Sequence, residues 1–166
     1  MHMVYTPLME PVLRAAVRAF AADEHLIDVL VANDEWLDLY DESGAQLPGI
    51  RGRAGAVGLS AHGEEIGVDL IEMDPGSAFP LHVHPGDHVL FGLEGEGFVT
   101  VNETDHRLGE GVTVFIAAEQ PHGVRGPVSG RFRFLAFGVP HKHVSSTSRM
   151  RLVDAEHSNL SASPEP

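Results

Sequence analysis

The sequence predicts an all-β fold, a sandwich or a barrel, preceded by a helical segment. From about residue 53 to about residue 139, short runs of Val, Leu, Ile and Phe alternate with glycine and proline. Many short apolar runs separated by turn residues are typical of antiparallel sheets. No strand–helix–strand alternation is visible, which disfavours a parallel doubly wound sheet. We expect strands at 54–61, 66–73, 79–84, 88–93, 96–102, 112–116, 122–125 and 131–138.

The segment before this region carries a helical pattern. Apolar residues recur at helical spacing between Pro11 and Ala22, and proline suits a first helical position. The pattern predicts a helix over 11–22 that packs on the β domain or on a partner subunit. A short strand is expected over 36–40, and Ser43-Gly44 and Pro48-Gly49 indicate turns.

The texture of the sequence divides the chain into three parts. We expect residues 1–50 to form a helical or irregular extension, 51–144 a single β domain, and 145–166 a tail whose Ser-rich end is partly mobile. A chain of 166 residues is an ordinary length for one domain and long enough to bury a core.

Composition narrows the classes of partner. The formal net charge of -13 repels phosphate backbones and anionic lipid head groups, so we expect neither nucleic acid nor a membrane as partner. No apolar run approaches the roughly 20 residues that span a bilayer, and no secretory pattern is visible, so we expect a cytoplasmic protein. The sequence has no cysteine, which excludes disulfides, thiolate metal sites and cysteine nucleophiles.

Four of the eleven histidines are spaced so that a β fold would bring them together. His82 and His84 are two residues apart, and side chains at i and i+2 on a strand face the same way. Pro85-Gly86 indicates a turn, after which His88 opens the next expected strand. His122 has a comparable place at the start of a later strand. Because imidazole is the commonest metal ligand and buried imidazoles need partners, these positions predict a metal site.

The segment around the first three histidines resembles the first sequence motif of the cupin family. That motif is a glycine, five residues, His-x-His, three or four residues, a glutamate, six residues and a glycine. Gly76, His82, His84 and Gly95 match it at this spacing. His88 stands where the glutamate is usual.

The segment that ends at His122 resembles the second cupin motif. Gly111 and His122 occupy the positions of the motif's glycine and histidine. Ala117, Glu119 and Gly126 replace its proline, its second glycine and its asparagine. These departures affect the turn before His122 and leave the ligand itself in place.

The resemblance covers about residues 66–138 and implies the double-stranded β-helix barrel, the cupin or jelly-roll fold. It implies one divalent metal ion inside the barrel, held by His82, His84, His88 and His122. All-imidazole sites suit Fe, Ni, Zn and Cu and only weakly exclude Mn, so the metal's identity stays open. Four neutral imidazoles leave the charge of the dication uncompensated, which favours anionic or enolisable ligands. Since cupins are often dimers, we also expect a homodimer.

Three functions are compatible with this site, each with a small-molecule substrate or ligand. The leading expectation is an Fe(II)-type oxygenase acting on a small organic molecule. The alternatives are a metal-dependent isomerase or polyketide-type cyclase, and a non-enzymatic cupin that binds a metabolite or a metal. Cupins with four histidines include proteins described as oxygenases and others described as polyketide cyclases. No acid–base residue besides the ligands stands out, which favours redox or Lewis-acid chemistry.

Strand alternation predicts the side chains that surround the metal. Arg131 and Arg133 share one face of the strand 131–138, which we expect to face water, so the alternate residues of the strand, beginning with Phe132, face inward. An apolar pocket over a metal suits a small organic substrate. The residues expected to line it are Phe79, Leu90, Phe132, Phe134 and Ala136.

Two further features lie close to the predicted site in the sequence. His141-Lys142-His143 is a second His-x-His, just after the last expected strand. We expect an exposed pair beyond the barrel; the alternative is a place at the barrel mouth or in a second metal site. We expect Asp87, which precedes His88, to be a solvated turn residue.

Overall fold

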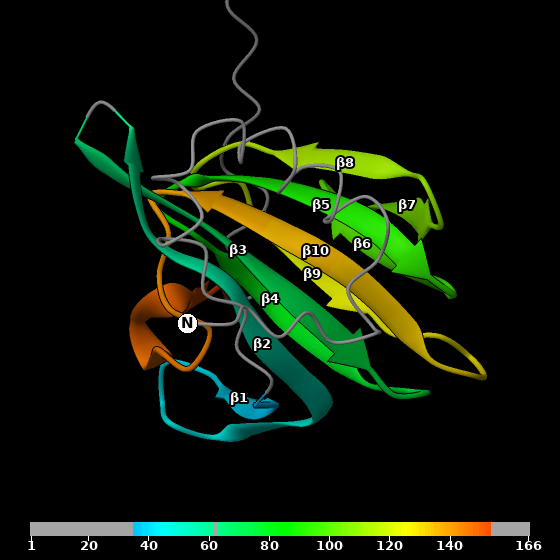
Figure 1. Cartoon of the computed structure of the whole chain (residues 1–166). Coiled ribbons are helices and arrows are strands. Elements are labelled where there is room, and N and C mark those ends of the chain that lie inside the picture. The colour runs from blue at the N-terminus through cyan, green and yellow to red at the C-terminus, as the bar shows by residue number, and fades with distance from the viewer. Residues whose placement is uncertain (1–34, 62, 154–166) are drawn as a thin grey trace, which may run out of the picture.

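The structure, a computed structural model, describes residues 35–61 and 63–153, and within them two antiparallel sheets face each other (Figure 1). The helix predicted over 11–22 lies outside the described residues. In the described part the one helical element is the short 3-10 helix η1, Thr147–Arg149. Among the same residues, no helix is long and apolar enough to cross a membrane. The all-β prediction is thus confirmed for the part of the chain that is described.

The larger sheet has six strands in the order β1-β2-β3-β10-β5-β8. All of its pairings are antiparallel, and β10 lies between β3 and β5. Its strands are β1 (Leu37–Tyr40), β2 (Gln46–Ala61), β3 (Glu64–Met73), β5 (Asp87–Glu94), β8 (Thr113–Ile116) and β10 (Phe132–Val139).

The smaller sheet has five strands in the order β11-β4-β9-β6-β7 and is also antiparallel throughout. The two histidine-bearing segments that match the cupin motifs form β4 and β9, which are neighbouring strands of this sheet. Its strands are β4 (Ala78–Val83), β6 (Glu96–Val101), β7 (Thr104–Gly109), β9 (His122–Arg125) and β11 (Arg151–Leu152).

The observed strands extend beyond the predicted ones at several points. The strand expected over 36–40 is present as β1, and β2 begins at Gln46, so residues expected in the extension belong to the larger sheet. Pro48-Gly49 was expected to be a turn but lies inside β2, where the positive φ of Gly49, 71°, marks a local departure from the extended backbone. β7 was not predicted, because four of its six residues are exposed and carry no apolar alternation.

The segment after β10 folds back against the smaller sheet. β11 pairs with β4, with Arg151 opposite Val83 and Leu152 opposite His82. Val144 and Met150 are buried in the main core. This segment therefore forms part of the enclosure around the core up to residue 153.

The main core lies between the two sheets, where inward side chains of both meet. The larger sheet contributes residues such as Ile71 and Leu90, and the smaller sheet contributes Val99 and Val124. Close packing between alternating inward side chains is what joins two such sheets. The core therefore surrounds the inner face of β4, the strand that carries His82.

The outer face of the larger sheet is less exposed to solvent than the alternation of residues along β10 predicts. Arg131 is exposed, as expected, but Arg133 is 8% exposed. Its Nε donates to Oε2 of the buried Glu72 at 2.6 Å. Burial by itself raises the pKa of Glu72, but Arg133 and Arg51 more than offset this and lower it. The expectation of a solvated Arg133 was wrong because a buried carboxylate 61 residues away pairs with it.

Candidate metal centre

Three of the predicted ligands come from the smaller sheet. His82 lies on β4 directly opposite His122 on β9, and His84 follows β4 by one residue. The pairing of β4 with β9 shifts register between Phe79 and His82, so both of these side chains are buried although they are three residues apart. The local irregularity therefore places an aromatic ring beside the histidines, with Phe79 and His82 ring centroids 6.0 Å apart.

Each of these three imidazoles is anchored to the backbone through Nδ1. His82 Nδ1 donates to the carbonyl of Pro80 at 2.6 Å, and His122 Nδ1 donates to that of Gln120 at 2.9 Å. His84 Nδ1 donates to the carbonyl of Arg149. Because a carbonyl can only accept, these bonds assign the proton to Nδ1 and leave Nε2 with a lone pair. Histidines that bind metals commonly have this second bond, which fixes the ring.

The free Nε2 atoms converge on one point. Nε2 of His82 and Nε2 of His84 are 3.0 Å apart, and ligand atoms of His82, His84 and His122 all lie within 4.8 Å of one another. Two facing lone pairs repel unless a cation lies between them. Ligands about 2.1 Å from an ion and at right angles to each other are about 3 Å apart. The three histidines therefore fit a metal ion, and they form a metal-capable group.

Burial keeps these imidazoles in the neutral form that a metal requires. Desolvation lowers the pKa of His84 to about 3, although the bond to the Arg149 carbonyl acts in the opposite direction. Desolvation, with the neighbouring His122 and His84, lowers the pKa of His82 well below its usual range. The pKa of His122 is lowered mainly by desolvation as well. Neutral imidazoles do not have to lose a proton before they bind a metal near pH 7.

The fourth predicted ligand, His88, is not a member of this group. It lies on β5, in the larger sheet, opposite Gly138 of β10. Its ring stacks on that of His84 with centroids 4.0 Å apart and planes at 20°, and its centroid is 6.3 Å from that of His122. Coming from the opposite sheet, the ring lies beside the group instead of converging with it. The structure thus groups three of the four predicted histidines.

The pocket over the three histidines is mostly apolar. Phe79, Leu90, Phe134 and Ala136 line it, as the alternation of the strands predicts. Phe132 is fully buried but does not line it; its ring stacks on Phe134 with centroids 5.1 Å apart. The sequence reasoning missed four lining residues, of which two lie on strands of the core and two come from the segment after β10: Ile71, Val124, Arg149 and Met150.

The loop before His122 is held in place despite its departures from the cupin motif. Glu119, at the position of the motif's second glycine, has φ of 59°, the left-handed region that glycine adopts without strain. Its N–H donates to the carbonyl of His84 at 2.8 Å. Asp87, expected only as a solvated turn residue, accepts a bond from the N–H of Ala118 at 2.9 Å. These bonds connect the loop to both neighbouring histidine segments.

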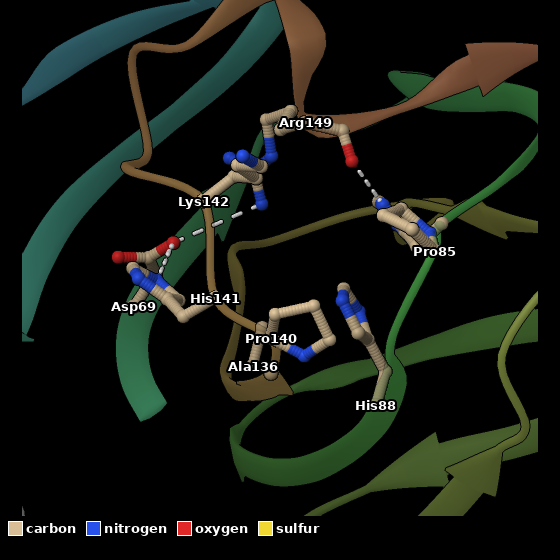
Figure 2. A pocket seen from close by; sticks show the side chains of 10 residues that line it. Asp69, Pro85, His88, Ala136, Pro140, His141, Lys142 and Arg149 are labelled. Carbon is tan, nitrogen blue, oxygen red and sulfur yellow. Dashed lines mark hydrogen bonds and ion pairs between the residues drawn. The ribbon is translucent and has the colours of Figure 1, made fainter. Parts of the chain in front are cut away.

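The second His-x-His is divided between the interior and the surface. His143 is exposed, as expected, and contacts Ser145. His141 is 5% exposed, so the expectation of an exposed pair was wrong for it. Its Nε2 lies 3.3 Å from Oδ2 of the buried Asp69 on β3 (Figure 2). A carboxylate distant in the sequence therefore draws this imidazole inside.

Comparison with protein families agrees with this geometry. The family profile described as "Cupin domain" matches residues 69–138, which span β3 to β10 and include all four predicted ligands. Residues 69–138 are thus a cupin domain, as the two motifs predict. The double-sheet barrel expected from the two motifs is the fold that this domain has.

A curated relative and several solved structures are similar to the chain. Dimethylsulfoniopropionate lyase DddW of Ruegeria pomeroyi is 31% identical over 86 residues, which cover 51% of this chain and 57% of that protein. The chain thus spans less than two thirds of this relative.

Among solved structures, a cupin-2 domain protein of Rhodospirillum rubrum has a TM-score of 0.57 and 20% identity, covering 74% of this chain and 76% of that one. The polyketide cyclase RemF of Streptomyces resistomycificus has a TM-score of 0.51 and 20% identity, covering 67% and 75%. At this identity the two structures support the fold alone.

Proposed function

We propose that this chain is a metal-dependent enzyme of the lyase type, acting on a small organic molecule with one divalent metal ion held by His82, His84 and His122. The observation that carries the proposal is the arrangement of the three imidazoles. Each imidazole donates a hydrogen bond from Nδ1 to a backbone carbonyl. Their Nε2 atoms converge on one point beside an apolar pocket. Such a group, buried and fixed, is suited to a metal and is poor as plain core.

The chain's own residues supply an environment for chemistry next to a carbonyl or carboxylate. A divalent ion bound there would act as a Lewis acid on a substrate oxygen and make the neighbouring C–H more acidic. Ile71, Leu90 and Phe134 exclude water from the pocket, which strengthens every electrostatic interaction inside it.

His88 is positioned to contact a substrate in this pocket. Among the described residues it makes no hydrogen bond, and its ring stacks on that of His84 at the edge of the group. Burial and the neighbouring imidazoles His84 and His122 lower its pKa to about 2, so the ring is neutral near pH 7. So low a pKa makes the ring a weak base, so we assign His88 the role of contacting and orienting the substrate beside His84.

The similarity to a lyase favours redox-neutral chemistry over the oxygenase predicted from the sequence. The relative with 31% identity is described as a lyase of dimethylsulfoniopropionate, a carboxylate with a leaving group on the third carbon. Nothing in the pocket is specific to reactions with O₂. The isomerase or cyclase alternative uses the same Lewis-acid step, and a non-enzymatic binding protein is one of the outcomes of the test. A homodimer, a cytoplasmic location and the absence of nucleic-acid and membrane partners remain part of the proposal.

The test is turnover without oxygen. The protein is loaded anaerobically with Fe(II), Mn(II), Ni(II) or Zn(II) in turn and incubated with dimethylsulfoniopropionate and other 3-substituted propionates. Elimination breaks the bond from the third carbon to the leaving group and removes a proton from the second carbon. With dimethylsulfoniopropionate it yields dimethyl sulfide, acrylate and a proton, which gas chromatography and NMR detect.

Matched variants assign the activity to the site. We expect His82→Ala to lose both its metal and its turnover. We expect His88→Gln to keep its metal and to lose turnover. The exposed His106, on β7, provides the control variant His106→Ala, which should be unaffected. Product formation only with oxygen consumption would contradict the lyase proposal in favour of the oxygenase. Bound metal without turnover of any compound would favour a binding protein.

A further inference from the structure

A second buried polar cluster lies next to the metal-capable group. Asp69 comes from β3, and His141 and Arg149 come from the segment after β10. Their exposed fractions are 2%, 5% and 7%. All three line a cavity that His84 and His88 also line, and Figure 2 shows them around it with Pro140 and Ala136. No step proposed above uses this cluster.

The contacts inside the cluster leave several polar atoms without partners. Asp69 Oδ2 lies 3.3 Å from His141 Nε2 and 3.8 Å from Arg149 Nη2, and Arg149 Nη1 donates to the carbonyl of Val144 at 3.0 Å. Asp69 Oδ1, His141 Nδ1 and Arg149 Nε are buried without any hydrogen-bond partner. Because buried polar atoms in folded proteins are nearly always satisfied, an ordered water or a bound group completes this cluster, and of the three atoms Arg149 Nε is the one that can donate to an anion.

Arg149 connects this cluster to the metal pocket. It lines the pocket over His82, His84 and His122 as well as the cavity with Asp69 and His141. Its backbone carbonyl anchors His84, which fixes its main chain beside the metal-capable group. Its guanidinium is close enough to contribute to the lowered pKa values of His82, His84 and His88. The Nε–H of Arg149, which has no hydrogen-bond partner, therefore belongs to a positively charged side chain that lines both the metal pocket and the cavity with Asp69.

The charges around these two spaces do not balance. Arg149 is positive, a divalent ion held by His82, His84 and His122 would add two positive charges, and Lys142 adds another at the exposed rim of the cavity. Asp69 is the one acidic residue among those that line either space. In a buried site the repulsion between the guanidinium and the metal is weakly screened, so an anion between them would be strongly favoured. A planar guanidinium with an unused N–H matches the geometry of a carboxylate.

We propose that Arg149 binds the carboxylate of the substrate beside the metal centre, so that this enzyme selects small carboxylic acids. Asp69 and His141 hold the guanidinium from the side away from the metal, and Arg149 is the specificity-determining residue. The inference rests on the proposed metal-dependent function and names its class of substrate. It predicts that an uncharged amide of the same shape is a poor ligand.

The test compares binding of propionate with that of propionamide, which has nearly the same shape and no charge. Protein loaded with Co(II) is titrated with each compound by calorimetry, and the metal content of each sample is measured. We expect propionate to bind wild-type protein at least about tenfold more tightly than propionamide, because charge-assisted bidentate bonds are much stronger than neutral ones. Equal affinities in the metal-loaded wild type would overturn the inference and leave the metal site standing.

Variants assign the preference to Arg149. Arg149→Met should abolish the preference for propionate, and Arg149→Lys should keep part of it, since the charge remains but the planar fork is lost. The control is Arg107→Met, because Arg107 is an exposed arginine of β7 that pairs with Glu96. If Arg149→Met does not fold, Arg149→Lys carries the test: a preference as large as that of wild type would mean that the metal alone selects the anion. A wild-type protein that takes up no metal overturns this inference together with the proposed function.

Discussion

Acid should unfold the metal-free protein, and His88 should account for a measurable part of the loss. Burial and neighbouring imidazoles lower the pKa of His88 to about 2, and burial lowers that of His84 to about 3. In the unfolded chain the pKa of a histidine is about 6.5. Above that value neither state binds the proton. As the pH falls below it, the unfolded chain takes up protons that the folded protein does not, so stability is lost as the pH falls.

The magnitude follows from the gap between the two pKa values. At pH 5 each histidine that titrates only in the unfolded chain lowers the free energy of unfolding by about 2 kcal/mol. His84 and His88 together give about 4 kcal/mol, and the lowered pKa values of His82 and His122 act in the same direction. Since domains are stable by about 5–15 kcal/mol, this loss is a large fraction of the stability of the metal-free protein.

The assay is urea denaturation with chelator present, at pH 8 and at pH 5, followed by the fluorescence of Trp36, the single tryptophan, which is partly buried. His88→Leu removes one titrating group and no hydrogen bond among the described residues. Its loss of stability between the two pH values should be smaller than that of wild type by about 2 kcal/mol. The exposed His106→Leu is the control and should behave as wild type. An identical loss in wild type and His88→Leu would show that His88 does not lose stability to acid in the way its burial predicts.

Three further predictions concern the site and its surroundings. Stabilisation by the metal, measured as the difference in melting temperature with and without chelator, should be larger at pH 8 than at about pH 5, because protons compete for the imidazoles; equal differences would contradict the histidine site. Phe134→Ala should lower the free energy of unfolding by about 3–5 kcal/mol in urea denaturation, since Phe134 is 2% exposed in the core; a loss below about 1 kcal/mol would mean that its ring is not packed as described. Glu119→Val should destabilise by about 1–2 kcal/mol while Glu119→Gly stays within about 1 kcal/mol of wild type, because residue 119 has a left-handed backbone; equal effects of the two would contradict that conformation.

Local patterns in the sequence predict those parts of the fold that depend on neighbouring residues. Alternation identifies the strands that bury one face, and the spacing of His82, His84 and His122 identifies the metal-capable group. β7 escapes this reasoning because its first four residues are exposed, and an exposed edge strand has no apolar periodicity to detect. Its place in the smaller sheet is fixed instead by pairing with β6.

Features that depend on contacts between distant segments could not be predicted. The burial of His141 follows from Asp69, 72 residues away, and that of Arg133 follows from Glu72, 61 residues away. His88 lies outside the group of three because β5 belongs to the other sheet, and sequence spacing does not distinguish the two sheets. Arg149 lies in a polar, Ser-rich segment whose return to the pocket has no local signal.

The metal centre of His82, His84 and His122 is tested by the metal content of the purified, metal-loaded protein. Elemental analysis of wild type is compared with His82→Ala, His84→Ala and His122→Ala, with His106→Ala as the exposed control. We expect close to one metal ion per chain in wild type and in the control, and a large loss in each of the three variants. His88→Gln should keep its metal. Metal retained by the three variants, or no metal in wild type under any loading condition, would mean that these histidines do not form a metal centre.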